Sequence, residues 1–205
     1  MTTWFKQYVQ VSFIGILVLA LLITTFTQKT ESQNDAKTYN IDATHSAVIF
    51  RAKHLGVSYN YGRFNDFSGS ITVDETDVSN SKIELEVKTA SVDTANGKRD
   101  QHLRSPDFFS AKQFPVITFK STKVSEKAGQ ENMLEVIGDF ELHGVKKSIT
   151  VDVEITGKGQ HPRAGALIGF ETTFDIKRSD YGMNYELKNV SDDIRITVSI
   201  EAAHK

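Results

Sequence analysis

The stretch MLEVIGDFELHGVKKSITVDVEI, residues 133–155, decides the fold of this chain, because its apolar residues recur at every second position. A period of two places alternate side chains on opposite faces of a β-strand. His143-Gly144 separates the two halves and is typical of a turn. The stretch therefore predicts two half-buried antiparallel strands. Their apolar faces consist of Leu134, Val136, Gly138, Phe140 and Leu142, and of Ile149, Val151, Val153 and Ile155.

The same alternation continues on both sides of this stretch. It is clear in KIELEVKTASV (82–92) and DIRITVSIEA (193–202), and weaker in HSAVIFRAKH (45–54), FNDFSGSITV (64–73), VITFKSTKV (116–124) and GFETTFDIKR (169–178). These runs make about eight strands without a βαβ rhythm, and Ala95–Gln113 alone lacks the alternation. The pattern predicts an all-β antiparallel barrel or sandwich with a short helical insert.

Strand length favours a barrel over a sandwich. Several runs reach ten residues, which span about 33 Å in extended conformation, and a closed barrel leaves no unpaired edge. An eight-stranded barrel is filled by its own side chains or holds one small ligand. Gly69, Gly138 and Gly169 interrupt apolar faces, and such glycines mark a bend or a close approach by another group. We therefore expect an elongated apolar cavity.

The composition excludes some classes of partner. The chain has 205 residues, 24% of them charged, and a formal net charge of -2. This is the composition of one ordinary globular domain, and it offers no basic surface for a nucleic acid. The chain contains no cysteine, which excludes disulfides and a lipid-modified N-terminal cysteine.

The N-terminal residues differ from the rest. Val11–Phe26 carries no charge, and the polar QKTESQNDAK follows it shortly afterwards. An apolar run of this length suits an export signal. We expect residues 1–30 to be a signal peptide or an uncleaved N-terminal membrane anchor, residues 31–38 to be a linker, and residues 39–203 to form the domain. If the segment stays uncleaved, it would hold the protein at the membrane.

Motifs for catalysis are scarce. The sequence lacks G-x-S-x-G, a Walker loop, H-E-x-x-H and a cysteine nucleophile. The six histidines form no pair at metal-ligand spacing. We therefore expect neither a resident metal nor a cofactor.

The segment RDQHLRSPDFF, residues 99–109, can be interpreted in two ways. His102 with Asp100 or Asp107 could begin a catalytic site, but no nucleophile accompanies them. Alternatively, Asp100 and Arg104 form an i,i+4 ion pair and Ser105 caps a second helical turn. Structural capping is the preferred interpretation. The apolar residues would then cover the open end of the barrel: Leu103, Phe108, Phe109 and Phe114.

Several separated motifs resemble one known family. They are, in order, HSAVIFRAKHLGVSYNYGRFNDFSGSI, SVDT, RDQHLRSPDFF, FPVITFKS, GDFELHGVKKSITVDV and GFETTFDIKRSDYGM. Together, from about Tyr39 to Ala202, they resemble the YceI-like family of polyisoprenoid-binding proteins. The resemblance implies a lipocalin-like antiparallel β-barrel that is secreted or periplasmic in bacteria. With residues 1–30 retained as an anchor, we expect it at the extracytoplasmic face of the inner membrane. It also implies a tunnel for an isoprenoid chain, as of a quinone or polyprenyl phosphate, and homodimers are known in the family.

The matched segments supply candidate site residues. Expected in the ligand pocket are Val48, Phe50, Ala52, Phe64, Phe67, Leu103, Phe108, Phe109, Phe119, Phe140 and Phe170. For each of them, packing in the core is the competing interpretation. Candidate donors to a polar headgroup are Arg99, His102, Arg104 and Arg178, because arginine presents a fork that fits a phosphate.

Three functions are compatible with this sequence. The leading hypothesis is non-enzymatic binding, transport or sequestration of a long isoprenoid lipid. The second is an enzyme that acts on a lipid or quinone through His102 with Asp100 or Asp107. The third is a structural or stress-related protein whose barrel is filled by its own side chains.

Overall fold

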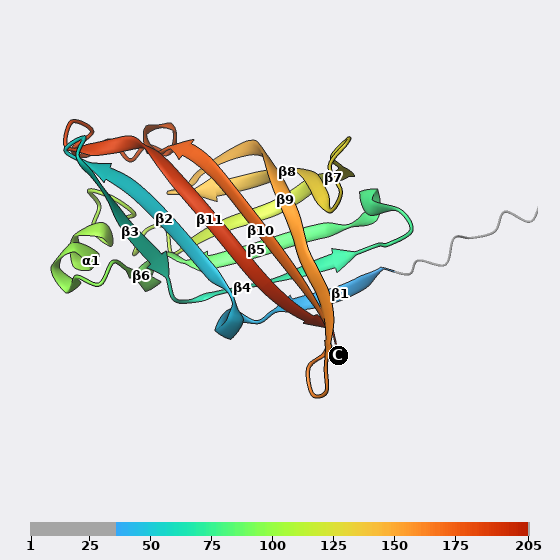
Figure 1. Cartoon of the computed structure of the whole chain (residues 1–205). Coiled ribbons are helices and arrows are strands. Elements are labelled where there is room, and N and C mark those ends of the chain that lie inside the picture. The colour runs from blue at the N-terminus through green and yellow to red at the C-terminus, as the bar shows by residue number, and fades with distance from the viewer. Residues whose placement is uncertain (1–35, 205) are drawn as a thin grey trace, which may run out of the picture. The chain divides into compact units, whose positions relative to one another are not determined.

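A computed structural model describes residues 36–204, which fold into one antiparallel sheet and a short helix (Figure 1). The neighbouring strands follow the order β1-β4-β5-β7-β8-β9-β10-β11-β2-β3-β6, and β1 also pairs with β11. The strands are β1 Lys37–Ile41, β2 Ala47–His54, β3 Ser58–Phe64, β4 Phe67–Val73, β5 Lys82–Lys88, β6 Val92–Asp93, β7 Val116–Glu126, β8 Met133–Leu142, β9 Val145–His161, β10 Gly165–Lys177 and β11 Val190–His204.

The eleven strands make an eight-stranded closed barrel, because three of its strands are bent. The turn at residues 42–46 separates β1 from β2, residues 65–66 separate β3 from β4, and residues 89–91 separate β5 from β6. The sheet closes where Ile41 of β1 pairs with Ala202 of β11, and Ala47 of β2 pairs with Ser199 farther along β11. The predicted all-β barrel of about eight strands with a helical insert is confirmed.

The apolar residues at every second position of a strand face the lumen of the barrel, and the residues between them face the surface. On β8, Leu134, Val136, Gly138, Phe140 and Leu142 are buried while the residues between them are half-buried. Two strands that the sequence did not predict, β1 and β3, complete the wall. Within β3 (SYNYGRF), Tyr59 and Tyr61 are exposed and only Gly62 and Phe64 extend a buried face, so the apolar alternation is hidden.

Residues 94–115, called the insert below, connect β6 to β7 and contain α1, Gly97–Leu103. In the described chain β6 pairs with β3 alone, so the insert replaces a β6–β7 pairing at this end of the barrel. Asn96 caps α1 by accepting a hydrogen bond from the Arg99 N–H.

The ion pair predicted for the insert is wrong. Buried Asp100 accepts a hydrogen bond from the Thr94 N–H at 2.8 Å, whereas Arg104 donates to the carbonyl of Val92, so the two form no ion pair. The tertiary fold gives each side chain other partners, because Asp100 also accepts from the Thr94 hydroxyl and Arg104 also donates to the Ala90 carbonyl. The predicted cap at Ser105 is present, since the Ser105 hydroxyl accepts from the Asp107 N–H at 3.3 Å and its carbonyl from the Phe108 N–H at 3.1 Å. The chain then continues as turns without a second α-helix.

The predicted signal peptide or anchor at residues 1–30 lies outside the described residues, as does most of the predicted linker. Of that linker, residues 37 and 38 already belong to β1. Among residues 36–204, the only α-helix is seven residues long, and none is long and apolar enough to cross a bilayer.

Candidate functional site

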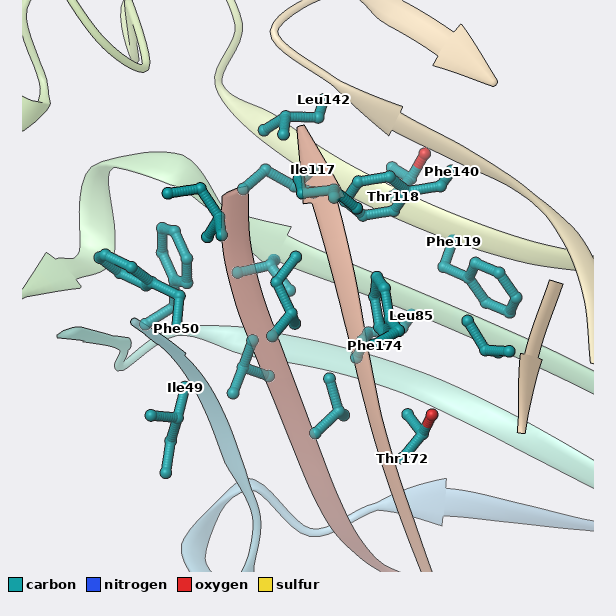
Figure 2. Close-up of a pocket in the computed structure, with 18 of the residues that line it drawn as sticks. Ile49, Phe50, Leu85, Ile117, Thr118, Phe119, Phe140, Leu142, Thr172 and Phe174 are labelled. Atoms are coloured by element: carbon teal, nitrogen blue, oxygen red, sulfur yellow. The ribbon is translucent and has the colours of Figure 1, made fainter. Parts of the chain in front are cut away.

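A cavity of about 180 Å³ lies inside the barrel, and almost all of its wall is apolar. Figure 2 shows side chains from β2, β5, β7 and β10 around the same space, among them Phe50, Leu85, Phe119 and Phe174. Ten of the eleven predicted pocket residues line it: Val48, Phe50, Ala52, Phe64, Leu103, Phe108, Phe109, Phe119, Phe140 and Phe170. The eleventh, Phe67, is buried in the core but does not line the cavity.

Many aliphatic residues of the cavity wall were not predicted from the sequence. The predicted list favoured phenylalanine, but every strand whose apolar face points inward contributes to the wall. The inward positions of the alternating runs were the signal that could have identified Ile71, Ile83, Leu85, Val151, Val153, Ile176, Ile194, Ile196, Val198 and Ile200.

The cavity extends along the barrel. On β11, its lining begins at Val190 and reaches Ile200, a separation of ten residues and about 33 Å along an extended strand. The wall therefore suits a long, thin apolar molecule better than a compact one.

Three phenylalanine rings narrow the cavity near the insert. The ring centroids of Phe50 and Phe64 lie 5.6 Å apart, and Phe109 of the insert packs against them at 6.1 and 5.5 Å. Distances of this kind are favourable for aromatic pairs. The insert therefore forms part of the cavity wall as well as covering the barrel.

Phe108 closes the same end in a different way. Its ring lines the cavity on one side and on the other meets His102 at 5.0 Å and Tyr185 at 5.4 Å between centroids. His102 and Tyr185 also lie 5.4 Å apart. The ring of Phe108 thus separates the lumen from the rings of His102 and Tyr185.

Arg178 is the buried cation of the cavity. The charged lining residues are Glu171, which is exposed, and Arg178, which is buried. The guanidinium of Arg178 donates to the carbonyl oxygens of Met183 (2.8 Å), Val190 (2.9 Å) and Ser191 (3.0 Å). Burial lowers its pKa, and Asp192 acts in the opposite direction. Arg178 therefore fixes the β10–β11 connection from inside.

The other three predicted headgroup donors lie outside the cavity wall and have protein partners. Arg99 donates to the Thr94 carbonyl at 2.6 Å, Arg104 to the Val92 carbonyl at 3.2 Å, and His102 Nε2 to Asp107 Oδ2 at 2.9 Å. His102 thus pairs with Asp107, and the His102/Asp100 pair of the enzyme hypothesis does not form.

One group of three residues within 36–204 has the composition of a metal site. Asp42, His45 and Glu201 place their ligand atoms within 4.8 Å of one another. However, His45 Nδ1 already bonds Asp42 Oδ2 at 2.9 Å, and Asp42 also accepts from the Thr44 N–H. The hydrogen bond to Asp42 and the negative charges of Asp42 and Glu201 raise the pKa of His45. These contacts stabilise the turn between β1 and β2.

The closed antiparallel barrel and its internal apolar cavity place the chain among β-barrels that can enclose an apolar ligand. The chain belongs to the YceI-like family, because the model of the YceI-like domain matches residues 39–202. A UPF0312 protein of Pseudomonas aeruginosa is 40% identical over 174 residues, which cover 84% of this chain and 90% of that protein.

Solved structures have the same fold. The YceI protein of Campylobacter jejuni is 36% identical, with a TM-score of 0.66 over 75% of this chain and 90% of that one. A polyisoprenoid binding domain from Saccharophagus degradans, implicated in plant cell wall breakdown, superposes with a TM-score of 0.63 over 82% of this chain and 98% of that one. Its sequence identity is 18%, so this likeness shows the fold alone.

Proposed function

We propose that the barrel binds the chain of an isoprenoid lipid, such as a quinone or a polyprenyl phosphate, and carries or sequesters it without chemical change. The elongated apolar cavity is the observation that carries the proposal. The name of the Saccharophagus degradans domain supports the ligand class. Each buried CH₂ contributes about 0.8 kcal/mol, so a few isoprene units bind tightly without a strong polar contact.

The volume of the cavity sets a condition on binding. A dry cavity of about 150 Å³ accepts benzene or xenon, so 180 Å³ holds a small apolar molecule while the walls stay in place. A chain of several isoprene units requires rings of the Phe50, Phe64 and Phe109 cluster to turn aside. The insert supplies Phe109 and is outside the hydrogen-bonded wall, so it is the part of the enclosure that can yield.

Arg178 limits the kind of headgroup that the cavity accepts at the insert end, where its guanidinium lies 5.9 Å from the centre of the Phe108 ring. Three of its N–H groups already bond backbone carbonyls, which leaves at most two donors for a ligand. One donor is enough for a quinone carbonyl, whereas a phosphate would need its own charge to be desolvated. We propose that a carbonyl headgroup fits beside Arg178, and that a phosphate stays at the surface.

We also propose that residues 1–30 direct export, so that the barrel works in the periplasm or at the extracytoplasmic face of the inner membrane. The uncharged run Val11–Phe26 supports this location. A lipid carrier there would meet its ligand in the adjoining bilayer.

Mass spectrometry of an organic extract of the purified full chain tests the function. We expect an isoprenoid lipid at a fixed ratio to protein. An extract without lipid would favour a barrel filled by its own side chains, and a ligand altered during incubation would favour an enzyme.

Variants of the insert locate the bound lipid. Phe108→Ala/Phe109→Ala removes two rings from the cavity wall and should lose most of the co-purified lipid. Phe114→Ala is the matched control, because Phe114 belongs to the same insert but packs on His143, 4.5 Å between centroids, and does not line the cavity. Equal lipid retention in both variants would contradict a site at the insert.

A further inference from the structure

The described residues with large exposed apolar side chains gather at one end of the barrel. Leu55 and Val57 form the β2–β3 turn and Tyr185 and Leu187 lie in the β10–β11 connection, with exposures of 58%, 83%, 40% and 40%. We call these four residues the apolar rim. Tyr59 and Tyr61 continue it along the outer face of β3. Exposed clusters of this kind mark interaction surfaces.

The two segments of the apolar rim lie side by side. The Leu55 N–H donates to the Asn189 carbonyl at 2.7 Å, and His54 pairs with Val190. Both turns lie at the end of the barrel that carries α1 (Figure 1). The rim is therefore one continuous surface.

The apolar rim is continuous with the cavity. The ring of Tyr185 lies 5.4 Å from that of Phe108, which lines the lumen. A molecule passing between the rim and the lumen at this point would meet the Phe108 ring, with the Arg178 guanidinium 5.9 Å from its centre. The rim therefore borders an apolar route into the barrel.

The backbone conformation at the tip of the β2–β3 turn is unfavourable for the leucine at position 55. Leu55 and Gly56 have φ values of +49° and +69°, as in a two-residue hairpin turn that favours Asn-Gly or Asp-Gly. A bulky residue in this left-handed region is an outlier, and burial does not compensate it, since Leu55 is exposed. Strain of this kind points to a function rather than to folding.

Cations border the apolar rim. Lys53 and Lys188 make no ion pair within residues 36–204, and the guanidinium of Arg51 lies 4.2 Å from the centre of the Tyr59 ring. Of the acids near the rim, Glu186 accepts a hydrogen bond from the Asn189 amide, and Asp107 pairs with His102. Apolar tips with tyrosines and surplus lysines fit the interface of a bilayer with anionic headgroups.

We infer that the apolar rim docks on an anionic lipid bilayer, with the Phe108 end of the barrel facing the acyl chains. This inference rests on the proposed function, because it supplies the route by which a lipid dissolved in a membrane reaches the cavity. The surface inserts its apolar tips only to the depth of the headgroup boundary, as interfacial proteins do.

The absence of cysteine makes a direct test possible in the full chain. Val57→Cys and Leu187→Cys each carry an environment-sensitive NBD fluorophore, and Gln130→Cys at the opposite end of the barrel is the control. We expect a blue shift at residues 57 and 187, and none at residue 130, when vesicles of phosphatidylcholine with 30% phosphatidylglycerol are added. Because each label reports its own surroundings, membrane contact by residues 1–30 does not mimic this result.

Two substitutions separate docking from folding. Leu55→Asn relieves the left-handed position, so it should keep or raise the melting temperature while weakening vesicle binding about five- to tenfold. Lys53→Gln/Lys188→Gln should weaken binding to the anionic vesicles by about fivefold per lysine, with little effect on pure phosphatidylcholine vesicles.

Several outcomes would overturn the inference. Equal shifts at all three labels, or none, exclude docking through the apolar rim. A shift at residues 57 and 187 that grows with protein concentration in the absence of vesicles would show a second copy of the chain on this surface instead. Lipid in the organic extract without any blue shift would refute the docking alone, whereas a blue shift without extractable lipid would refute the proposed function alone.

Discussion

The ring of Phe119 on β7 occupies the space that a side chain at position 138 of β8 would take. A Cβ added to Gly138 would lie 2.4 Å from Phe119 Cζ and 2.7 Å from the Lys120 carbonyl oxygen. Because Phe119 lines the cavity, this glycine lets an aromatic ring lie flat against the wall instead of crossing the lumen.

Gly138→Ala should therefore push the Phe119 ring away from the wall and strain β7. We expect a loss of about 1–3 kcal/mol in the free energy of unfolding, as for other overpacked sites, and less bound lipid. Urea denaturation measures the first effect, and lipid extraction measures the second. Gly159→Ala is the control, because nothing lies within 4 Å of a Cβ at that strand position. A similar loss in both variants would show that backbone freedom, not the ring, is responsible.

Arg178→Lys should destabilise the barrel by about 3 kcal/mol or more, because a single ammonium cannot serve the carbonyls of Met183, Val190 and Ser191 together, and each unsatisfied buried group costs about 1–3 kcal/mol. Urea denaturation of the variant measures this. Arg163→Lys, at an exposed turn, should change stability by less than about 0.5 kcal/mol. A loss in Arg178→Lys no larger than in the control would show that the carbonyls find other donors.

Stability should decrease as the pH rises from about 6 to 8, through the turn that joins β1 to β2. The pKa of His45 is raised above 6.5 by its hydrogen bond to Asp42 and by the charges of Asp42 and Glu201. A raised folded-state pKa contributes stability below the unfolded-state pKa, and this contribution is lost as the pH rises through the folded-state pKa. The urea midpoint, measured at both ends of this range, should fall less in His45→Asn. Identical pH dependence in the two proteins would exclude the contribution.

At low pH, protonation of Asp74 should destabilise the loop between β4 and β5. Hydrogen bonds from Thr76, Asp77 and Asn80 lower its pKa from 3.8 to about 2. A lowered pKa contributes stability above the unfolded-state value, and this is lost as the pH falls from about 4 to 2.

Asp74→Asn should therefore lose less stability over that range than the unsubstituted chain, as measured by urea denaturation at pH 5, 3.5 and 2. Glu131→Gln, an exposed carboxylate on the β7–β8 connection, should leave the pH dependence unchanged. If Asp74→Asn retained the full acid sensitivity, other carboxylates would account for it.

The sequence was sufficient to predict most of the barrel wall, but not β1, β3 or the bends. The period-two pattern of β8 identifies the buried face because a slip of one residue would expose every apolar side chain. The break between β1 and β2 depends instead on hydrogen bonds to β11, such as that from the Asp42 N–H to the Glu201 carbonyl, and no local pattern shows a partner 159 residues away.

The candidate site was predictable to a similar degree. Inward positions follow from alternation, so Val48, Phe50 and Phe140 were found. The partners of Asp100 and Arg104 were not, because i,i+4 spacing shows only that two side chains can meet, whereas the tertiary fold offers each a backbone group. Nor does any local signal show that Arg178 is buried.

The unpaired position of the insert has an evolutionary consequence. The barrel wall depends on strand register, so a changed length in β8 or β11 would displace many side chains at once. The insert contributes Leu103, Phe108 and Phe109 to the cavity without any strand pairing that its length could disrupt. A change in the length or sequence of this segment would therefore reshape one end of the cavity while the register of the barrel stays the same.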